Sequence, residues 1–515
     1  MNAELAGHRD HLNGRLEAIA ARLPEKVAVV AESSTLTYAE LLRRADSFAA
    51  PLRDAGVRSG DRVVVVLPNG AEFVVAAFGV WRLGAILTPL HTQLRPGEIV
   101  RCVLDCRARA LVVGDAMDDT VGAVMEKCSD LVEHVWHWSK AEARWRCDWD
   151  KASIRVSTHT TPDDDGQQGA DIPALTQFST GSTGHPKRVT RTHRHLIGEV
   201  EAVSRVLGRT EVDRVLGVAP FFHSHGLMNA VLGSLLTGGT LYAVERFFPR
   251  EVARLIEQEN ITGFPGSPFM FQSLAELPDR IAFPHLRWVV SAGAPLPPSL
   301  SATFRARFGA GIRELYGCTE AGVLTVASDA DPVDEHTVGR PIPGVRIGVV
   351  DAQRRPVRLG EKGVIEVTSE HAAPRYDHAD NWLEAHFVGR KFYPGDIGRL
   401  TLDGRVVLLG RDRGFINVAG NKVDPTEVES VLRELAEVTD AAVLGIPDGA
   451  AQEKVKAVLV VSTPCSREIV LAHCRRRLAP FKIPRVIEFR TELPTNLLGK
   501  VLRKYLLDEE GADPA

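Results

Sequence analysis

Residues 179–189 read STGSTGHPKRV, the most unusual stretch of the chain. Its first nine positions hold two glycines, four hydroxyl side chains and one lysine. Glycines let backbone N–H groups approach an anion closely and adopt positive φ, hydroxyls add donors, and a lysine supplies a mobile positive charge. This mixture therefore indicates a loop that binds a polyphosphate.

The loop departs from the Walker sequence G-x-x-x-x-G-K-[ST], which places a lysine directly after the second glycine. Here His185 follows Gly184, and the lysine comes at position 187. A P-loop NTPase is therefore disfavoured. Taken by itself the stretch has a second interpretation as a flexible surface turn, because small polar residues are common in loops.

The flanking sequence alternates between strand-like and helix-like patterns. Short β-branched runs occur at 62–68, 110–113, 214–220 and 287–293, and an amphipathic segment runs from Tyr38 to a terminating Gly56. Such alternation predicts α/β layers, with Gly56 as a helix C-cap. The polar segment 157–174 is rich in turn-forming residues, so we expect an exposed connector there.

A second break is predicted near residues 410–421. Beyond it, two strand-like runs and an arginine-rich helix make a unit of about a hundred residues, which is a typical domain size. We therefore expect two domains, residues 1–410 and 411–515. At 515 residues the chain is long enough for well-buried cores in both.

Composition excludes several classes of protein. Hydrophobic residues at 44% and charged residues at 25% are typical of soluble globular proteins. The 62 basic and 66 acidic side chains give a net charge of −4, which favours neither nucleic acid nor an anionic membrane as a partner. The N-terminal MNAELAGHRDHL lacks the apolar core of a signal peptide, and no apolar run reaches the length of a membrane span, so we expect a soluble, cytoplasmic protein. Seven scattered cysteines indicate neither a disulfide framework nor a zinc site.

Seven further motifs follow the glycine-rich loop in a fixed order. They are PFFHSHGL at 220–227, SAGAPL at 291–296, LYGCTEAG at 315–322, TVGRPIPG at 337–344, YPGDIGRL at 393–400, GRDRGFINVAGNKVDPTEVE at 410–429 and LPTNLLGKVLRK at 493–504. Together with STGSTGHPK, they resemble the adenylate-forming superfamily of acyl-CoA synthetases, peptide-synthetase adenylation domains and luciferases, most closely the acyl- and aryl-CoA ligases. The resemblance covers nearly the whole chain.

The resemblance implies an α/β fold. Its large N-terminal domain would hold two layered α/β sheets and a distorted β-barrel, and a small mobile α+β domain would follow. It also implies an activity: ATP-dependent conversion of a carboxylic acid to an acyl adenylate, with release of pyrophosphate, and then transfer to the thiol of coenzyme A. An enzyme that loads a phosphopantetheinyl carrier protein is the alternative, because both acceptors present the same thiol. Such an enzyme would be a monomer or a homodimer.

The resemblance assigns ATP, Mg²⁺ and coenzyme A as ligands and carries roles onto individual residues. The ATP and AMP site would comprise Ser179, Thr180, Gly181, Ser182, Thr183, Gly184, Lys187, Gly293, Ala294, Pro295, Tyr316, Gly317, Thr319, Asp396 and Arg411. Tyr316 would stack on adenine, and Asp396 with Arg411 would fix the ribose. Glu320 would be a Mg²⁺ ligand, since hard oxygen donors suit that ion.

Lys500 carries most of the implied chemistry. A carboxylate must attack the α-phosphate, and a lysine ammonium would bridge these two anions in the transition state. The C-terminal domain would then turn about Arg413 as a hinge, so that Gly420 lines the tunnel for pantetheine, with Arg246 near coenzyme A. Pro394, Gly414 and Asn417 depart from the residues usual in the family, which leaves details of the thioester step open.

The acid pocket would be lined by His223, His225, Asn229, Val290, Gly317, Val323 and Leu324. His223 would also gate the incoming thiol, and its alternative role is that of a buried core histidine. Adenylation domains for α-amino acids keep an Asp near the start of this pocket, where the present chain reads PFFHSHG. An unpaired buried ammonium is costly, so an aryl or fatty acid is favoured. A luciferase-like oxygenase and a catalytically inactive binding protein are the remaining classes; intact Lys500, Glu320 and Asp396 argue against the latter.

Overall fold

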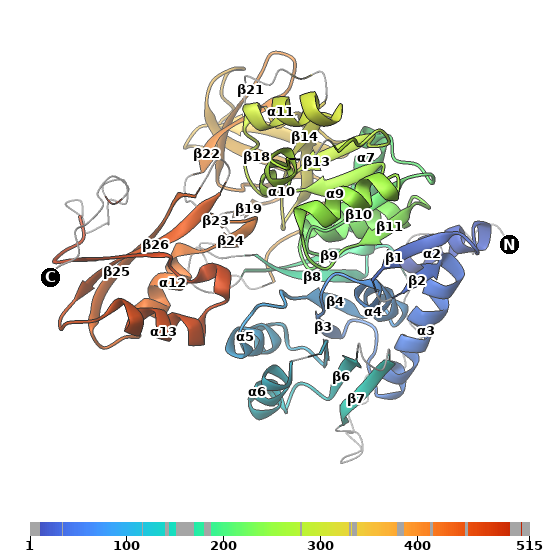
Figure 1. Ribbon diagram of the computed structural model, residues 1–515, viewed down its shortest axis with the longest axis horizontal. Coiled ribbons are helices and arrows are strands. Elements are labelled where there is room, and N and C mark those ends of the chain that lie inside the picture. The colour runs from blue at the N-terminus through green and yellow to red at the C-terminus, as the bar shows by residue number, and fades with distance from the viewer. Residues whose placement is uncertain are drawn as a thin grey trace.

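The computed structural model describes residues 11–32, 34–115, 117–139, 144–150, 169–179, 187–278, 281–328, 331, 337–377, 386–411, 416–448, 452–494 and 506. Three sheets with their helices make up the large N-terminal part, and the C-terminal part stands to one side of it (Figure 1). The predicted fold class, a large α/β N-terminal region with a small C-terminal α+β unit, is thereby confirmed.

The first sheet has seven strands in the order β7-β6-β5-β3-β4-β8-β9. They are β3 (Arg62–Val66), β4 (Ile86–Pro89), β5 (Ala110–Val113), β6 (His134–Ser139), β7 (Arg144–Asp150), β8 (Pro173–Ser179) and β9 (Lys187–Thr192). The inner strands are parallel and mostly apolar because helices cover both faces of the sheet. These helices are α3 (Tyr38–Asp54), α4 (Ala71–Arg82), α5 (Pro96–Cys106) and α6 (Asp118–Cys128).

The second sheet has nine strands in the order β16-β15-β14-β13-β12-β10-β11-β1-β2. Its members are β1 (Val27–Ala31), β2 (Thr35–Thr37), β10 (Arg214–Gly217), β11 (Thr240–Ala243), β12 (Gly263–Gly266), β13 (Trp288–Ser291), β14 (Ile312–Cys318), β15 (Gly322–Val326) and β16 (Arg340–Pro341). Strands β1 and β10 to β14 run parallel, so their carboxyl ends meet at one edge. The helices α2 (Leu12–Arg22), α7 (His193–Leu207), α9 (Pro249–Gln258), α10 (Pro268–Ala275) and α11 (Pro298–Phe308) accompany this sheet.

The third sheet is antiparallel throughout. It contains β17 (Val345–Val350), β18 (Gly363–Ser369), β19 (Phe387–Val388), β20 (Lys391–Phe392), β21 (Asp396–Leu400) and β22 (Val406–Arg411). Its strand β21 begins with Asp396 next to the second sheet. There the hydroxyl of Tyr316 in β14 donates a hydrogen bond to the Asp396 carboxylate.

The C-terminal part begins with a hairpin of β23 (Ile416–Val418) and β24 (Asn421–Val423). A three-stranded sheet follows, made of β25 (Val438–Pro447), β26 (Glu453–Val461) and β27 (Val486–Arg490). Its helices are α12 (Pro425–Leu432), α13 (Arg467–Arg477) and the short 3₁₀ helix η5 (Pro480–Lys482). The hairpin lies between this sheet and the N-terminal part, which places it at the site described below (Figure 1).

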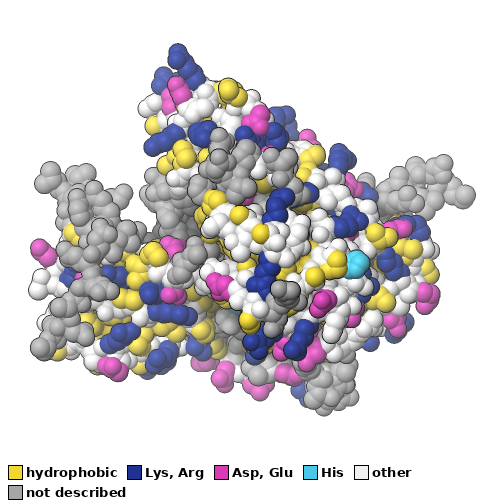
Figure 2. Space-filling model, turned by 45° about the horizontal axis from the view of Figure 1, so that its top comes forward, with side chains coloured by type: hydrophobic (Ala, Val, Ile, Leu, Met, Phe, Trp, Pro, Cys, Tyr) yellow, Lys and Arg dark blue, Asp and Glu magenta, His cyan; other side chains and the backbone are white. Residues whose placement is uncertain are grey.

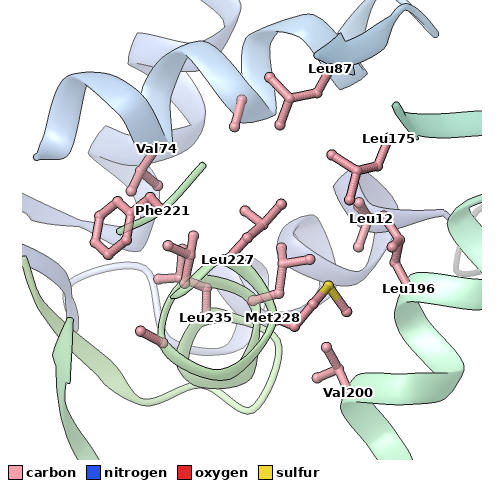
Figure 3. Packing of buried hydrophobic residues seen from close by; sticks show 14 of the residues in the cluster. Leu12, Val74, Leu87, Leu175, Leu196, Val200, Phe221, Leu227, Met228 and Leu235 are labelled. Atoms are coloured by element: carbon pink, nitrogen blue, oxygen red, sulfur yellow. The ribbon is translucent and has the colours of Figure 1, made fainter. Parts of the chain in front are cut away.

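A π-helix, η2 (His225–Leu232), continues into α8 (Gly233–Leu235) at the centre of the largest apolar core. Met228 of η2 points toward Val200 of α7, and Leu227 of η2 belongs to the same apolar core (Figure 3). Single π-helical turns are rare and concentrate at functional sites. One face of η2 therefore packs in the core, and residues on its other face line the cavity described below.

The predicted elements agree with the structure in most places. The helix from Tyr38 ends at Asp54, and Gly56 follows with a φ of +91°, as its predicted C-cap role requires. The predicted connector 157–174 extends too far, because Pro173 and Ala174 already belong to β8 and pair with β9. The six cysteines whose side chains are described are all free thiols, as predicted.

The described helices include none that is long and apolar enough to cross a membrane. On the molecular face that Figure 2 shows, basic and acidic side chains are intermingled. This face therefore offers no broad field of one sign, which agrees with the small net charge of −4.

Candidate active site

A cavity of about 1830 Å³ lies at the carboxyl edge of the second sheet. Loops that follow β10, β12 and β13 line it, together with the turn between β14 and β15 and the hairpin of β23 and β24. The carboxyl ends of parallel strands are where α/β folds place their ligand sites. The cavity is therefore the candidate active site.

Most of the residues predicted to bind the nucleotide line this cavity. They are Lys187, Gly293, Ala294, Pro295, Tyr316, Gly317, Thr319, Glu320 and Asp396. The predicted loop residues Thr180, Gly181, Ser182, Thr183 and Gly184 lie outside the described residues, and Ser179 is described only as the backbone end of β8. Strand β8 pairs with β9 up to Ser179 and Lys187, so the two ends of the loop are next to each other.

Tyr316 and Asp396 form a direct contact in the nucleotide region. The Tyr316 hydroxyl donates a hydrogen bond of 2.5 Å to Oδ2 of Asp396, and both side chains are buried. Strands β21 and β22 pair Asp396 with Arg411, whose side chain lies outside the described residues. Tyr316 and Asp396, which are both predicted to contact the nucleotide, therefore come from different sheets and lie in direct contact.

Glu320 is held by a tyrosine that sequence reasoning missed. The Tyr376 hydroxyl donates to Oε1 of Glu320 at 2.9 Å, and the Lys187 ammonium lies 5.5 Å from the centre of the Tyr376 ring. Burial and the neighbouring Glu320 raise the pKa of Tyr376, so the hydroxyl keeps its proton. The Tyr376 hydroxyl therefore orients the Glu320 carboxylate.

These residues suit a cation that is shared with phosphate. The described residues contain no group of three or more His, Cys, Asp or Glu side chains that could hold a metal ion alone. Mg²⁺ usually keeps several waters and binds one or two protein carboxylates together with substrate phosphates. A single oriented carboxylate, Glu320, next to the ends of the phosphate loop fits that donor set.

The acid pocket of the sequence prediction is brought together in part. His223, His225, Asn229, Gly317 and Val323 line the cavity. Val290 and Leu324 are not among its described lining residues, because both side chains are fully buried in the apolar core. Position 317 requires glycine, since a Cβ there would lie 2.4 Å from the carbonyl oxygen of Gly322.

Glu314 is an acidic lining residue that the motifs did not reveal. Its Oε1 accepts a hydrogen bond from the Leu296 amide at 3.2 Å, and burial raises its pKa to about 7. A carboxyl group whose pKa is near neutrality in a cavity is a feature of many functional sites. No sequence pattern identifies Glu314, because a single glutamate within a strand is typical of a solvent-exposed position.

His223 lies at the cavity wall among aromatic rings. Burial, with smaller effects of Lys422, His91 and His225, lowers the pKa of His223 to about 3, so the imidazole is neutral. Its ring lies 4.9 Å from that of Phe222, which in turn lies 4.4 Å from His91. His91 stacks at 5.0 Å on Phe481 of the C-terminal part. This row of rings connects the acid side of the cavity with η5.

The hairpin of the C-terminal part closes one side of the cavity. Asn417 Nδ2 donates to the carbonyl oxygen of Gly293 at 3.1 Å, and its Oδ1 accepts from the Gly420 amide at 2.9 Å. Gly420 has a φ of +87°, and both it and Asn417 line the cavity. The predicted tunnel residue Gly420 is thus adjacent to the predicted nucleotide residue Gly293.

A buried ion cluster holds the two parts of the chain together. Lys482 Nζ lies 2.7 Å from Oε1 of Glu98 in α5 and 2.8 Å from Oε1 of Glu427 in α12. The Arg95 guanidinium also donates to the carbonyl oxygen of Leu478 at 3.2 Å. Nothing in the motifs predicted this cluster, since Glu98 and Lys482 are 384 residues apart in the sequence.

The remaining predicted residues lie at or beyond the margin of the site. Arg246 lines the cavity mouth with a largely exposed side chain, 3.6 Å from the Glu245 carboxylate. Arg413 and Lys500 lie outside the described residues. Leu493 and Leu506, which flank residues 495–505, pack on Ala442, Leu444 and Val458 of the C-terminal sheet.

Two family models match this chain. The family model described as AMP-binding enzyme matches residues 16–377, and that of the AMP-binding enzyme C-terminal domain matches residues 427–500. The 3-[(3aS,4S,7aS)-7a-methyl-1,5-dioxo-octahydro-1H-inden-4-yl]propanoyl:CoA ligase of Rhodococcus jostii is 31% identical over 96% of this chain and 98% of its own length.

Two solved structures are similar over the whole chain. The o-succinylbenzoate CoA synthetase of Bacillus subtilis has a TM-score of 0.85 and 26% identity, and it covers 96% of this chain and 98% of its own. An amide bond synthetase from Marinactinospora thermotolerans gives the same TM-score, identity and coverage.

Proposed function

This chain belongs to the AMP-binding enzyme family and is an adenylate-forming enzyme, and on that premise we propose that it is an acid–thiol ligase with coenzyme A as acceptor. In the first step, a carboxylate oxygen of the acid attacks the α-phosphorus of ATP, and the bond to the β-phosphate breaks to release pyrophosphate. In the second step, the thiolate sulfur of coenzyme A attacks the acyl carbon, and the bond to AMP breaks.

One observation supports this proposal above the others: a single cavity contains both groups of residues that the reaction needs. Tyr316, Asp396 and Glu320 lie on the nucleotide side, and His225 and Asn229 lie on the acid side. Gly317 lines the same cavity, and glycine is required there because a Cβ would lie 2.4 Å from the carbonyl oxygen of Gly322 in the neighbouring strand. Holding both reactants in one cavity turns a bimolecular step into a unimolecular one.

The nucleotide roles follow from the chemistry of these side chains. We assign Ser179, Thr180, Gly181, Ser182, Thr183, Gly184 and Lys187 to the phosphates of ATP. Glu320, oriented by the Tyr376 hydroxyl, would hold Mg²⁺ jointly with phosphate oxygens, and the ion supplies charge neutralisation when bound. Asp396, Arg411 and Tyr316 would hold the ribose and adenine.

The arrangement of the two parts suits the second step. The hairpin residues Asn417 and Gly420 line the cavity next to Gly293, and neutral His223 lies at the acid side. We assign Gly420 and Arg246 to the path of coenzyme A. Lys500 would serve the first step in a second arrangement, reached by rotation about Arg413, with the domain boundary between residues 410 and 411.

The experiment that tests this division of labour uses Lys500→Ala. We expect it to abolish acid-dependent exchange of pyrophosphate into ATP and to leave thioester formation from pre-made acyl adenylate largely intact. Arg413→Pro is expected to show the reverse defect. Lys454→Ala, at a half-buried position in β26, is the matched control. Equal loss of both steps in Lys500→Ala would contradict the assignment.

A further inference from the structure

The π-helix η2 presents two polar side chains to the cavity on the face opposite its core contacts. Leu227 and Met228 point into the apolar core (Figure 3), whereas His225 and Asn229 line the cavity. Positions four apart lie on the same side of a helix, and Asn229 Nδ2 indeed lies 3.3 Å from His225 Nδ1. Under the proposed function, this pair contacts the acid.

A continuous series of hydrogen bonds fixes how this pair is protonated. His225 Nε2 lies 3.1 Å from the carbonyl oxygen of Gly266, which can only accept, so Nε2 carries the proton. Burial lowers the pKa of His225 to about 4, and the ring is neutral. Its Nδ1 is therefore an acceptor, and the group of Asn229 that faces it must be the amide NH₂.

Arg209 fixes the same orientation from the other side. Its Nη2 donates to Oδ1 of Asn229 at 3.1 Å, so the amide oxygen turns toward the arginine and the NH₂ turns toward the cavity. The amide NH₂ has two hydrogens, and His225 takes one of them. The second hydrogen is a donor at the wall of the cavity.

The arginine behind Asn229 is a buried cation. Its guanidinium lies 4.6 Å from the centre of the Trp288 ring, and the acidic residues that act on it, Asp213 and Glu199, do so through space rather than through a salt bridge among the described residues. Its Nε and Nη1 have no hydrogen-bond partner among the described residues. Burial lowers its pKa only to about 10, so the positive charge persists at neutral pH.

The surrounding backbone is built to admit this guanidinium. A Cβ at position 233 would lie 2.1 Å from Arg209 Nη1, so the guanidinium occupies the space that the glycine leaves beside the helix. A buried charge that is only partly satisfied is expensive, and its field is strong in a low-dielectric interior. Arg209 therefore polarises the Asn229 amide and makes its free hydrogen a stronger donor.

We propose that the acid substrate of this enzyme carries a hydrogen-bond-accepting oxygen on the part that lies against η2, with Asn229 as the specificity-determining residue and Arg209 as its positioning residue. This inference rests on the proposed function and narrows its substrate class. An apolar group at that point leaves the Asn229 donor unpaired in a buried site. An ammonium is repelled by Arg209. A ketone or ether oxygen satisfies the donor and faces the positive field.

The test compares acids that differ at one group. Two scaffolds are used, each as a ketone, a methyl analogue and an ammonium form of similar size. The aromatic series is 4-acetylbenzoate, 4-isopropylbenzoate and 4-(aminomethyl)benzoate. The aliphatic series is 5-oxohexanoate, 5-methylhexanoate and 6-aminohexanoate. The measurement is kcat/KM for acid-dependent pyrophosphate release. On the scaffold that the enzyme accepts better, we expect the ketone to exceed the methyl analogue by at least about tenfold, and the ammonium form to be the poorest.

Variants separate this inference from general damage to the site. Asn229→Leu should bring the ketone and methyl forms within about threefold of each other, mainly through a higher KM for the ketone. Asn229→Asp keeps the shape but replaces the donor with a carboxylate oxygen beside Arg209, so the aminomethyl form should gain relative to the ketone. Arg209→Met should reduce the ketone preference, and Arg209→Lys should restore part of it. Met228→Leu, on the core face of η2, is the matched control and should leave the ratio unchanged.

The outcomes are distinct. If acids support pyrophosphate release but the ketone and methyl forms react equally, or if Asn229→Leu leaves their ratio unchanged, the inference is wrong and the proposed function stands. If no acid supports pyrophosphate release, both are wrong. Thermal unfolding of each variant shows which ones fold. If Arg209→Met does not fold, the two Asn229 variants are enough to test the inference.

Discussion

Replacement of Lys482 with methionine should slow thioester formation far more than adenylation. Lys482 is almost fully buried between Glu98 of the N-terminal part and Glu427 of the C-terminal part, at 2.7 and 2.8 Å. Burial alone would lower the pKa of this lysine, but the two carboxylates outweigh it and raise the pKa above its usual value. Lys482→Met leaves two buried carboxylates facing each other without their lysine, and only Arg101, 4.0 Å from Oε1 of Glu427, stays as a neighbouring cation.

The size of the effect follows from the burial of the three groups. Removal of one partner from a buried ion pair costs about 3–5 kcal/mol, because the remaining charge is left uncompensated. Only the arrangement in the structure bears this cost, since Glu98 becomes hydrated when the two parts separate. Every 1.4 kcal/mol changes an equilibrium about tenfold, so a cost of about 3–5 kcal/mol should shift the docking equilibrium away from the docked arrangement by at least about two orders of magnitude.

The assay measures the two steps separately on the same protein. Conversion of pre-made acyl adenylate and coenzyme A to thioester should slow by about two orders of magnitude, and acid-dependent pyrophosphate exchange should stay close to the wild-type rate. Glu98→Gln should have a smaller effect, because Lys482 keeps Glu427. Lys454→Met removes a half-buried lysine that lies 3.7 Å from Asp448 and is the control.

Two results would refute this reasoning. One is an equal decrease of both steps in Lys482→Met, which would indicate general damage. The other is an unchanged thioester step, which would show that the observed docking plays no part in it.

The raised pKa of Lys482 means that its contribution to docking is fully present below the ordinary lysine pKa near 10.5 and is lost only as pH rises above that value. The docking should therefore be insensitive to pH between about 7 and 9.

Two further predictions concern stability. Burial lowers the pKa of five histidines below their ordinary value near 6.5, to about 4 for His91, His195 and His225 and about 3 for His193 and His223. The unfolded chain binds more protons than the folded one between these values, so the free energy of unfolding in urea should fall as pH decreases from 6.5 toward 4; a constant value down to pH 4.5 would contradict this. Gly226→Ala should destabilise the protein by about 1–3 kcal/mol, because its Cβ would lie 2.2 Å from the carbonyl oxygen of Pro220. Gly122→Ala, in α6 with open space around it, should be neutral or stabilising in the same unfolding assay, and equal shifts in both variants would disprove the steric reasoning.

The motifs brought most of the residues assigned to the nucleotide side to one cavity, because each of them lies within a short motif of distinctive composition. Tyr316, Glu320 and Asp396 are examples, and all three line the cavity. The acid side was predicted less well. Val290 and Leu324 belong to strands that are buried throughout, and a continuous apolar run gives no alternation to show which residues face a cavity.

The contacts between distant segments could not be predicted from local patterns. The cluster of Glu98, Glu427 and Lys482 joins residues from both parts of the chain, and each looks like an ordinary surface charge in the sequence. Arg209 is similar, since its contact with Asn229 depends on a π-helical turn that periodicity does not reveal. Such pairs are set by tertiary packing rather than by local propensity.

The most direct test of the central claim is exchange of labelled pyrophosphate into ATP, measured over a panel of aryl, fatty and α-amino acids with product analysis after addition of coenzyme A. We predict exchange that depends on an aryl or fatty acid, followed by formation of its coenzyme A thioester and AMP. Absence of exchange with every acid of the panel would contradict the proposed activity.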